Sequence, residues 1–339
     1  MARNRTEIVS LKLLASLAGV SKSSVSRCLS GKCGVSEQTS FKIREIAKKL
    51  GYTKNIPLSK AMSQIRSGGM RGSETIAFVN AKPVRDLKAY SAVSRYVAAA
   101  RKSAEKYGYC VCDIWLCEKN FTAQKFENLL FTRGIRGGII FGHYYKNSIP
   151  DGFCSAVKKL KFVSMGVNSN APVKGSVFMD RFLLVKGFVK KIFKLGFDRV
   201  GFVIEKFADK YEDGKFSGGF LSAQLERGKR NIIPPHYWGK SDLKNAEGLS
   251  AYVRRHRLDA LFCYSTDISD IISKNPPIGA KIFHYDERFA EKHTPRISNQ
   301  KQVGKEAVKM LSEMLSSHGG EICSPKQLSL TPEWSRKNS

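Results

Sequence analysis

The fold of this chain is constrained most by a regular alternation of short apolar runs and longer amphipathic segments from residue 74 onward. The short runs have the length of β-strands, and the segments between them place apolar residues at helical spacing. This alternation predicts parallel sheets covered by helices, and eight strand-like runs predict two doubly wound lobes. The strand-like runs are 75–80, 110–116, 138–141, 162–165, 177–179, 200–204, 260–263 and 281–283. The helical segments are 93–107, 123–131, 183–195, 216–227 and 243–256.

The first seventy residues have a different rhythm, with three short helical segments and clear helix boundaries. Ser10, Ser21 and Ser36 each precede a helical pattern, where a serine side chain can cap the first turn. Gly19 and Gly51 follow the first and third patterns, as glycine often does at a helix end. Three helices with a tight turn between the first two predict a helix-turn-helix domain.

The charge of the chain favours a polyanion as partner. The 339 residues carry 58 Lys plus Arg against 29 Asp plus Glu. Residues 1–70 hold 13 basic and 3 acidic side chains, and residues 71–339 hold 45 and 26. Nucleic acid is the first hypothesis for such a balance, and a general solubility device is the alternative.

Location and cofactor use follow from what the sequence lacks. No apolar stretch approaches the ~20 residues of a membrane span, and the first residues do not read as a secretion signal. Eight cysteines, spread along the chain, suit a reducing compartment better than a disulfide framework. We therefore expect a cytoplasmic protein with no membrane partner, no metal and no cofactor.

A specific motif in the first domain resembles a known family. Ala18-Gly19-Val20-Ser21, followed by Val25-Ser26-Arg27, is similar to the headpiece of the lactose repressor (LacI/GalR) family of bacterial transcription regulators. Weaker similarities continue at Gly137-Gly138, Gly219-Phe220 and Thr266-Asp267. The resemblance implies an all-α helix-turn-helix headpiece followed by an α/β core of two parallel-sheet lobes, similar to the periplasmic binding proteins.

The domain boundaries that we expect combine the resemblance with the change of rhythm. The headpiece spans 1–55, a hinge or linker spans 56–73, and the core spans 74–335. Within the core, lobe 1 is expected at about 74–172 plus 299–322, and lobe 2 at about 173–298 plus 323–335.

The second helix is the expected reader of DNA. A recognition helix enters the major groove with its N-terminal residues near the base edges. Lys22, Ser23 and Arg27 lie at helix positions 1, 2 and 6, which the resemblance also marks as base readers. Arg27 can bond guanine with two hydrogen bonds, whereas Ser21 and Ser24 are expected to hold the DNA backbone. The alternative is a helical subdomain whose basic face is only solvated.

The hinge departs from the family pattern. Lys54 stands where the family has a proline, before Asn55. With one inserted residue, Ser59 and Lys60 match the positions that enter the minor groove, and Met62 takes the place of the leucine that wedges between base pairs. Without the insertion, the small Ala61 would occupy that place. The alternative is an ordinary tether.

The resemblance implies a small-molecule effector between the lobes, but the residues match poorly. Asp267 stands at the acidic ligand position, and Trp238 lies where an aromatic platform would be. Phe216 replaces the usual arginine, Arg181 replaces an asparagine, and Tyr90 is the aromatic residue nearest a missing aromatic pair. We therefore expect a sugar-like or anionic effector, or a lost response. The alternative is that Asp267 and Trp238 are structural.

These expectations together predict one function and leave two alternatives. The chain is expected to be a DNA-binding regulator, most often a repressor in this family, that binds a pseudo-palindromic operator as a homodimer at the bacterial nucleoid. No phosphate-binding loop, nucleophile elbow or zinc-protease motif is present, so we expect no enzyme. The alternatives are a basic DNA-binding protein without an effector, or a ligand-sensing protein without regulatory DNA binding.

Overall fold

The protein is described by a computed structural model that covers most of the chain. The described residues are 11–29, 35–50, 74–87, 90–143, 145–228, 231–239, 247–317 and 324–335. The chain divides into two compact units, Met1–Arg71 with Glu313–Glu321 and Gly72–Ser312 with Ile322–Ser339. Every helix among the described residues is too short or too polar to cross a bilayer.

The first unit contains the three predicted helices, α1 (Leu11–Ala18), α2 (Lys22–Leu29) and α3 (Glu37–Lys49). The α1–α2 turn depends on Gly19, whose φ of 69° is a left-handed conformation that side chains disfavour. Val20 N–H then donates to the Ala15 carbonyl, which closes the end of α1. The small core of this unit is made by Leu14, Ala15, Ala18, Val25, Cys28, Ile43 and Ala47.

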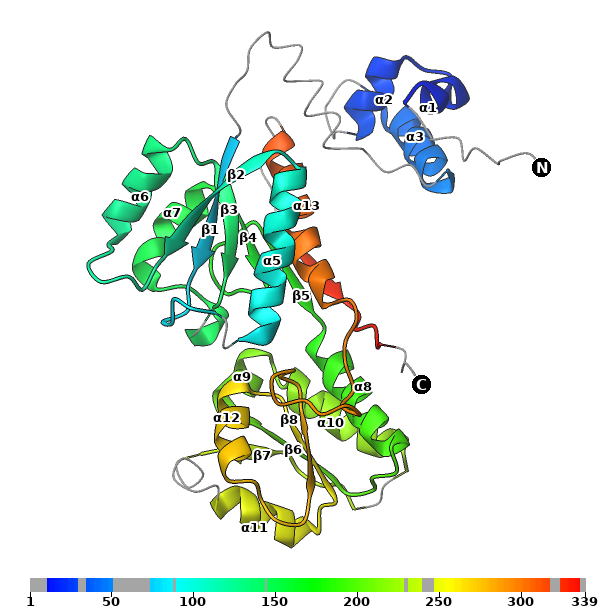
Figure 1. The fold of residues 1–339 in the computed structure, drawn as a ribbon. Coiled ribbons are helices and arrows are strands. Elements are labelled where there is room, and N and C mark those ends of the chain that lie inside the picture. The colour runs from blue at the N-terminus through cyan, green and yellow to red at the C-terminus, as the bar shows by residue number, and fades with distance from the viewer. Residues whose placement is uncertain are drawn as a thin grey trace, which may run out of the picture. The chain divides into compact units, whose positions relative to one another are not determined.

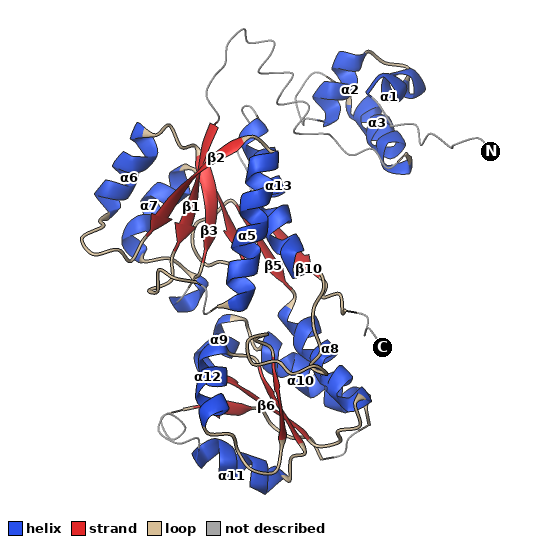
Figure 2. Cartoon of the chain, in the orientation of Figure 1, coloured by secondary structure: helices blue, strands red, loops and turns tan. Residues whose placement is uncertain are grey.

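The first lobe of the second unit is built on a six-stranded parallel sheet in the order β10-β5-β4-β3-β1-β2 (Figure 2). Figure 1 shows α5 and α13 on one face of this sheet and α6 and α7 on the other. The strands are β1 (Glu74–Asn80), β2 (Tyr109–Trp115), β3 (Gly137–Phe141), β4 (Lys161–Met165), β5 (Gly175–Met179) and β10 (Lys326–Leu330). The helices are α5 (Ser91–Lys106), α6 (Ala123–Thr132), α7 (Cys154–Lys159) and α13 (Gln300–Ser316), with short 3-10 turns at Tyr145–Asn147 and Asp151–Phe153.

The second lobe is built on a four-stranded parallel sheet in the order β7-β6-β8-β9. Its strands are β6 (Val200–Glu205), β7 (His236–Trp238), β8 (Ala260–Cys263) and β9 (Lys281–His284). Its helices are α8 (Arg181–Lys194), α9 (Lys206–Tyr211), α10 (Lys215–Glu226), α11 (Glu247–His256) and α12 (Thr266–Lys274). The alternation of strands and helices predicted from the sequence is therefore confirmed, as is the helix-turn-helix followed by an α/β core.

The expected boundary between the lobes is wrong in two places. β5 lies after residue 173 but pairs with β4, and β10 pairs with β5, so both strands belong to the sheet of the first lobe. The chain reaches the second lobe only where Asp180 caps α8. After β10 it returns, because Trp334 packs its ring 6.1 Å from that of Phe188 on α8. Hydrogen bonding between neighbouring strands decides these places, and apolar spacing alone does not reveal it.

Aromatic packing holds α8 and α10 against the second sheet. Phe202 on β6 has no exposed surface, and its ring lies 5.3 Å from Phe262 on β8 and 5.4 Å from Phe220 on α10. Phe188 stacks on the same Phe262 ring at 4.0 Å. These four rings form one continuous apolar layer in the second lobe.

We predict that Phe202→Ala lowers the free energy of unfolding by about 3 to 5 kcal/mol, because it leaves a cavity in that layer. Urea denaturation followed by circular dichroism measures the change. Phe131→Ala is the matched control, since Phe131 is 87% exposed and its removal should cost less than about 0.5 kcal/mol. Equal losses in the two variants would contradict the packing described above.

Candidate nucleic-acid interface and ligand pocket

The α2 helix is positioned by the core of the first unit so that one side faces solvent. Val25 and Cys28 are buried, with exposed fractions of 0% and 4%. Lys22, Ser23 and Arg27 are exposed. Ser23 and Arg27 are four residues apart and therefore share one face of the helix, away from the buried side chains.

The first turn of α2 is fixed by serine hydroxyls. The Ser21 hydroxyl accepts a hydrogen bond of 3.1 Å from the Ser24 backbone N–H, which caps the helix as predicted. The same hydroxyl lies 2.6 Å from that of Ser23 and 2.9 Å from that of Ser24. The structure thus gathers the five predicted DNA contacts of this helix at its exposed side and N-terminal end. The other predicted contacts, Asn55, Ser59, Lys60 and Met62, lie outside the described residues.

In the second unit, a pocket of about 250 Å³ lies where the carboxyl ends of strands from both sheets meet. The strand order reverses once in each sheet. The reversal is at β1 in the first sheet, where β1 lies between β2 and β3, and at β6 in the second, where β6 lies between β7 and β8. Ligand sites in parallel sheets form beyond the strands at such points. The pocket is lined by residues that follow these strands, including Lys82, His143, Glu205, Asp267 and Asp286. We call it the interlobe pocket.

Four of the five predicted effector residues line this pocket, namely Tyr90, Arg181, Phe216 and Asp267. Trp238 is not among the lining residues; it is half-buried on β7, where it pairs in register with Glu205. The platform role predicted for Trp238 therefore has no support from its position.

Arg181 is a buried cation at the start of α8. Its guanidinium donates a hydrogen bond to the Gly166 carbonyl and lies 3.9 Å from a carboxylate oxygen of Glu212. Its Nε atom is buried and has no hydrogen-bond partner among the described residues. The guanidinium carbon lies 5.9 Å from the centre of the Phe216 ring and 6.0 Å from that of Tyr264. Arg181 thus places a positive charge beside two aromatic rings of the pocket lining.

A second group of polar residues in the lining of the interlobe pocket includes Lys82, Tyr90, Glu205 and Asp267. The Tyr90 hydroxyl donates to Asp267 Oδ1 at 3.4 Å, and Lys82 Nζ lies 3.9 Å from the centre of the Tyr90 ring. Burial lowers the pKa of Lys82, although the nearby Asp267 and Glu205 partly oppose this. Burial also raises the pKa of Glu205, which accepts a hydrogen bond from the Ser265 hydroxyl.

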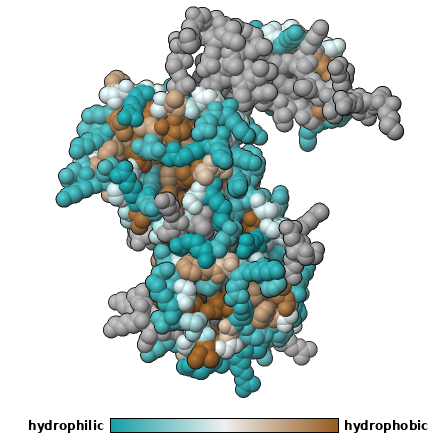
Figure 3. All heavy atoms as spheres, in the orientation of Figure 1, coloured by the Kyte–Doolittle hydropathy of each residue, from teal (hydrophilic) through white to brown (hydrophobic). Residues whose placement is uncertain are grey.

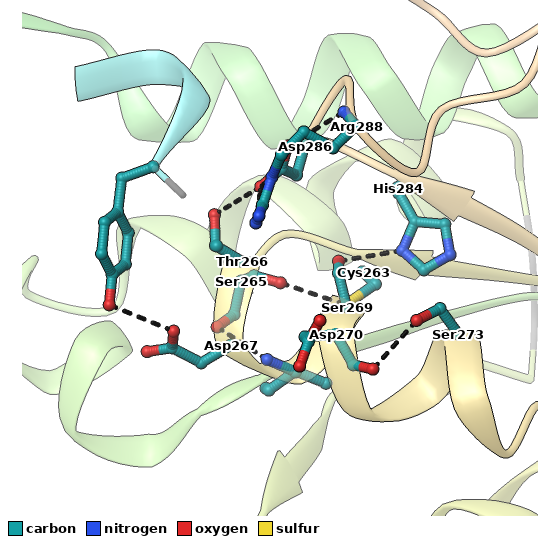
Figure 4. Close-up of polar contacts among 12 residues, drawn as sticks. Cys263, Ser265, Thr266, Asp267, Ser269, Asp270, Ser273, His284, Asp286 and Arg288 are labelled. Atoms are coloured by element: carbon teal, nitrogen blue, oxygen red, sulfur yellow. Dashed lines mark hydrogen bonds and ion pairs between the residues drawn. The ribbon is translucent and has the colours of Figure 1, made fainter. Parts of the chain in front are cut away.

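The loops after β8 and β9 are held together by a network that Figure 4 shows. Asp286 accepts hydrogen bonds from the Thr266 hydroxyl at 2.8 Å and from Arg288 at 2.9 Å. The His284 Nδ1 atom lies 2.8 Å from the Ser269 hydroxyl, and burial lowers the pKa of this imidazole to about 4. His284 is therefore a structural group that ties β9 to α12.

The lining of the interlobe pocket is acidic. Four carboxylates, from Glu205, Glu212, Asp267 and Asp286, face two cations, Lys82 and Arg181. Of the two kinds of effector expected from the sequence, sugar-like or anionic, this balance does not support the anionic one. Among the described residues, no three His, Cys, Asp or Glu side chains are placed to hold a metal ion.

The sequence contained a signal for the lining residues that sequence reasoning missed. Lys82, His143 and Glu205 each stand at or just beyond the end of a predicted apolar strand. Polar residues at the carboxyl ends of parallel strands are the expected place for ligand contacts. Tyr264 carries the same signal, because it directly follows the predicted strand at 260–263. Glu212 had no such signal, because it follows the short helix α9.

The first unit matches a known family of proteins. Residues 10–55 match the family model described as bacterial regulatory proteins, lacI family. Residues 10–55 are a lacI-family helix-turn-helix domain. This confirms the resemblance stated from the Ala18 to Arg27 motif. No curated protein sequence matches the chain.

Solved structures resemble the whole chain and extend the likeness beyond the lacI-family domain. The transcriptional regulator CelR in complex with cellobiose has a TM-score of 0.58 at 16% identity and covers 97% of this chain and 98% of its own. The lac repressor dimer bound to operator has a TM-score of 0.51 at 16% identity, with 97% and 98% covered. The trehalose repressor of Escherichia coli has a TM-score of 0.56 at 13% identity, with 78% and 100% covered. At such identities these structures show that the core of this chain shares their two-lobe fold.

We predict that His143 makes stability depend on pH. Burial lowers the pKa of its imidazole to about 3, whereas a histidine in an unfolded chain titrates near pH 6.5. Between about pH 3 and 6.5 the unfolded chain binds a proton that the folded chain does not. The free energy of unfolding therefore falls with falling pH, by up to about 1.4 kcal/mol per pH unit for this residue.

Urea unfolding of the wild type and His143→Gln at several pH values measures this effect. The variant should have a slope shallower by about 1 kcal/mol per pH unit between pH 5.5 and 4.5. The comparison at pH 7.5 is the control, because histidine is neutral there in both states and only the change in packing remains. Parallel slopes would show that His143 takes up its proton in the folded chain.

Proposed function

We propose that this protein is a sequence-specific DNA-binding transcription regulator, and that it acts as a repressor. The observation that carries the proposal is the exposed face of α2, where Ser23 and Arg27 project from a domain that matches the lacI family. Arginine reads guanine through two parallel hydrogen bonds in the major groove. The site of action would be the DNA of the cytoplasm, and the role would be binding, with no catalytic step.

The assembly that we propose is a homodimer on a pseudo-palindromic operator. A single headpiece buries little surface on DNA, whereas two related by a two-fold axis read two half-sites. The lac repressor dimer bound to operator, which shares the fold of this chain, offers the precedent. Asn55, Ser59, Lys60 and Met62 would add backbone and minor-groove contacts in such a complex.

The regulatory ligand that we propose is a neutral, sugar-like molecule in the interlobe pocket. Carboxylates accept hydrogen bonds from hydroxyls, and Phe216 and Tyr264 add aromatic rings to the lining of the pocket. The relatives named for cellobiose and trehalose have the same fold. Binding across two lobes would change the balance between DNA-binding and released forms.

We predict that Arg27→Ala loses sequence preference while it keeps salt-sensitive binding to any duplex. Removal of a bidentate guanine interaction costs about 1 to 3 kcal/mol at one base pair. Selection of bound DNA from random oligonucleotides, followed by titration of the selected and scrambled sequences, measures the change. Arg44→Ala is the control, because Arg44 is also exposed but lies on α3.

Two results would contradict this assignment of α2. The Arg27 variant could select the same operator with unchanged affinity, which would place base reading elsewhere. The wild type could protect DNA uniformly in a footprint, which would favour a DNA-coating protein.

We predict that neutral mono- or disaccharides, and not their phosphorylated or carboxylated counterparts, raise the melting temperature of the full-length chain. A ligand that binds only the folded state at 100 times its Kd adds about 2.7 kcal/mol. Asp267→Asn should weaken the response at least tenfold, because a neutral amide is a weaker acceptor for hydroxyls than a carboxylate. Stabilisation by anions alone would overturn the neutral assignment.

A further inference from the structure

A second charged surface lies on the first lobe, in the groove between α5 and α13. The groove has a volume of about 460 Å³. Six basic side chains line it, and Glu306 is its one acidic lining residue. The basic residues are Arg95, Lys102 and Lys106 of α5, with Lys301, Lys305 and Lys309 of α13. We call this surface the α5–α13 groove. Figure 3 shows hydrophilic side chains over this part of the molecule.

The two rows of lysines are brought together by a close approach of the two helices. A Cβ atom on Gly304 would lie only 2.2 Å from the Tyr96 carbonyl oxygen, so glycine is what allows the backbones of α5 and α13 to approach. Lysines four residues apart along each helix are spaced by about 6 Å. The result is two adjacent rows of positive charge along a groove whose lining includes Ala98 and Ala99.

Most of this charge is not neutralised by neighbouring carboxylates. Arg95 is bound to Glu287, and Lys309 lies 3.7 Å from Glu306. The other four lysines make no ion pair with any residue that the structure describes, and all four are exposed. They are Lys102, Lys106, Lys301 and Lys305. Like charges at this spacing repel one another, so the groove is complementary to a row of anions.

We propose that the α5–α13 groove binds the phosphodiester backbone of DNA that flanks the site held by residues 10–55. The proposal rests on the proposed function, because the headpiece brings DNA to the same chain at a high effective concentration. Lysine ammonium groups bind phosphates as point charges and read no sequence. The groove therefore adds affinity for long DNA without adding sequence preference.

The test compares full-length wild type with a variant that carries Lys102→Ala, Lys106→Ala, Lys301→Ala and Lys305→Ala. Each protein is titrated with a short duplex of the selected operator, and with the same operator inside long flanking DNA, over a range of salt concentrations. On long DNA, the slope of log K against log salt should be shallower in the variant by about 0.9 for each phosphate that its groove no longer neutralises. The gain in affinity from short to long DNA should shrink, and the preference for operator over scrambled DNA should stay the same.

A matched variant controls for the change in net charge. It carries Lys119→Ala, Lys158→Ala, Lys194→Ala and Lys292→Ala, which are exposed lysines outside the groove. If the groove and control variants have the same salt slope and the same gain from flanking DNA, the proposal is wrong. If tripolyphosphate raises the melting temperature of wild type but not of the groove variant, while flanking DNA has no effect, the groove takes a free polyanion and the DNA assignment fails.

Failure of the groove proposal can be distinguished from failure of the proposed function. A wild type without any operator preference would overturn the function itself. A wild type that prefers its operator, with a groove variant that behaves as the control does, would overturn only the groove.

Discussion

Parallel pairing of β1 with both β2 and β3 is the constraint on which the rest of the first lobe depends. Parallel strands require crossover helices, and a central strand with neighbours on both sides makes the connections leave in opposite directions. The carboxyl end of β1 is therefore left open, and Lys82 lies two residues beyond it. The same arrangement of β6 in the second sheet leaves Glu205 at an open strand end. The pocket is thus a consequence of strand order, before any side chain is considered.

Burial shifts the pKa values of two charged groups in the lining of this pocket. Lys82 and Glu205 carry opposite charges, yet desolvation works against the ionised form of both, by lowering the pKa of one and raising the pKa of the other. A polar ligand that brings hydroxyl groups would restore part of the lost solvation. The buried Nε of Arg181 makes no hydrogen bond with the described residues, although it lies 3.9 Å from Glu212, so it adds a hydrogen-bond donor that is not used in the same lining. Hydroxyl-rich ligands suit such a mixture of donors and acceptors better than a single anion does.

The helices, the strands and the exposed face of α2 could be predicted from the sequence because all of them depend on local periodicity. Val25 and Cys28 had to be buried for a three-helix domain to have a core, which left Ser23 and Arg27 outside. The lobe boundary was missed because β5 and β10 read as ordinary strands, and only their hydrogen-bonded partners assign them to a sheet. Asp267 was found through a family motif, whereas Glu212 was not, since its place beside Arg181 depends on the packing of α9 against neighbouring elements. The position of Trp238 also depends on tertiary structure: it lies on the edge strand β7 and is not among the residues that line the pocket.

The positive charge of the chain is distributed in a way that composition does not reveal. The core carries a large excess of basic residues, yet its interlobe pocket is lined by more carboxylates than cations. The excess must therefore lie on outer surfaces, and the lysine rows of α5 and α13 are one such place. Charge on outer helix faces acts at longer range and is screened by salt, whereas charge in a buried pocket selects a ligand by direct hydrogen bonding. The two proposed roles, attraction to a polyanion and recognition of a small molecule, thus fall on different parts of one core.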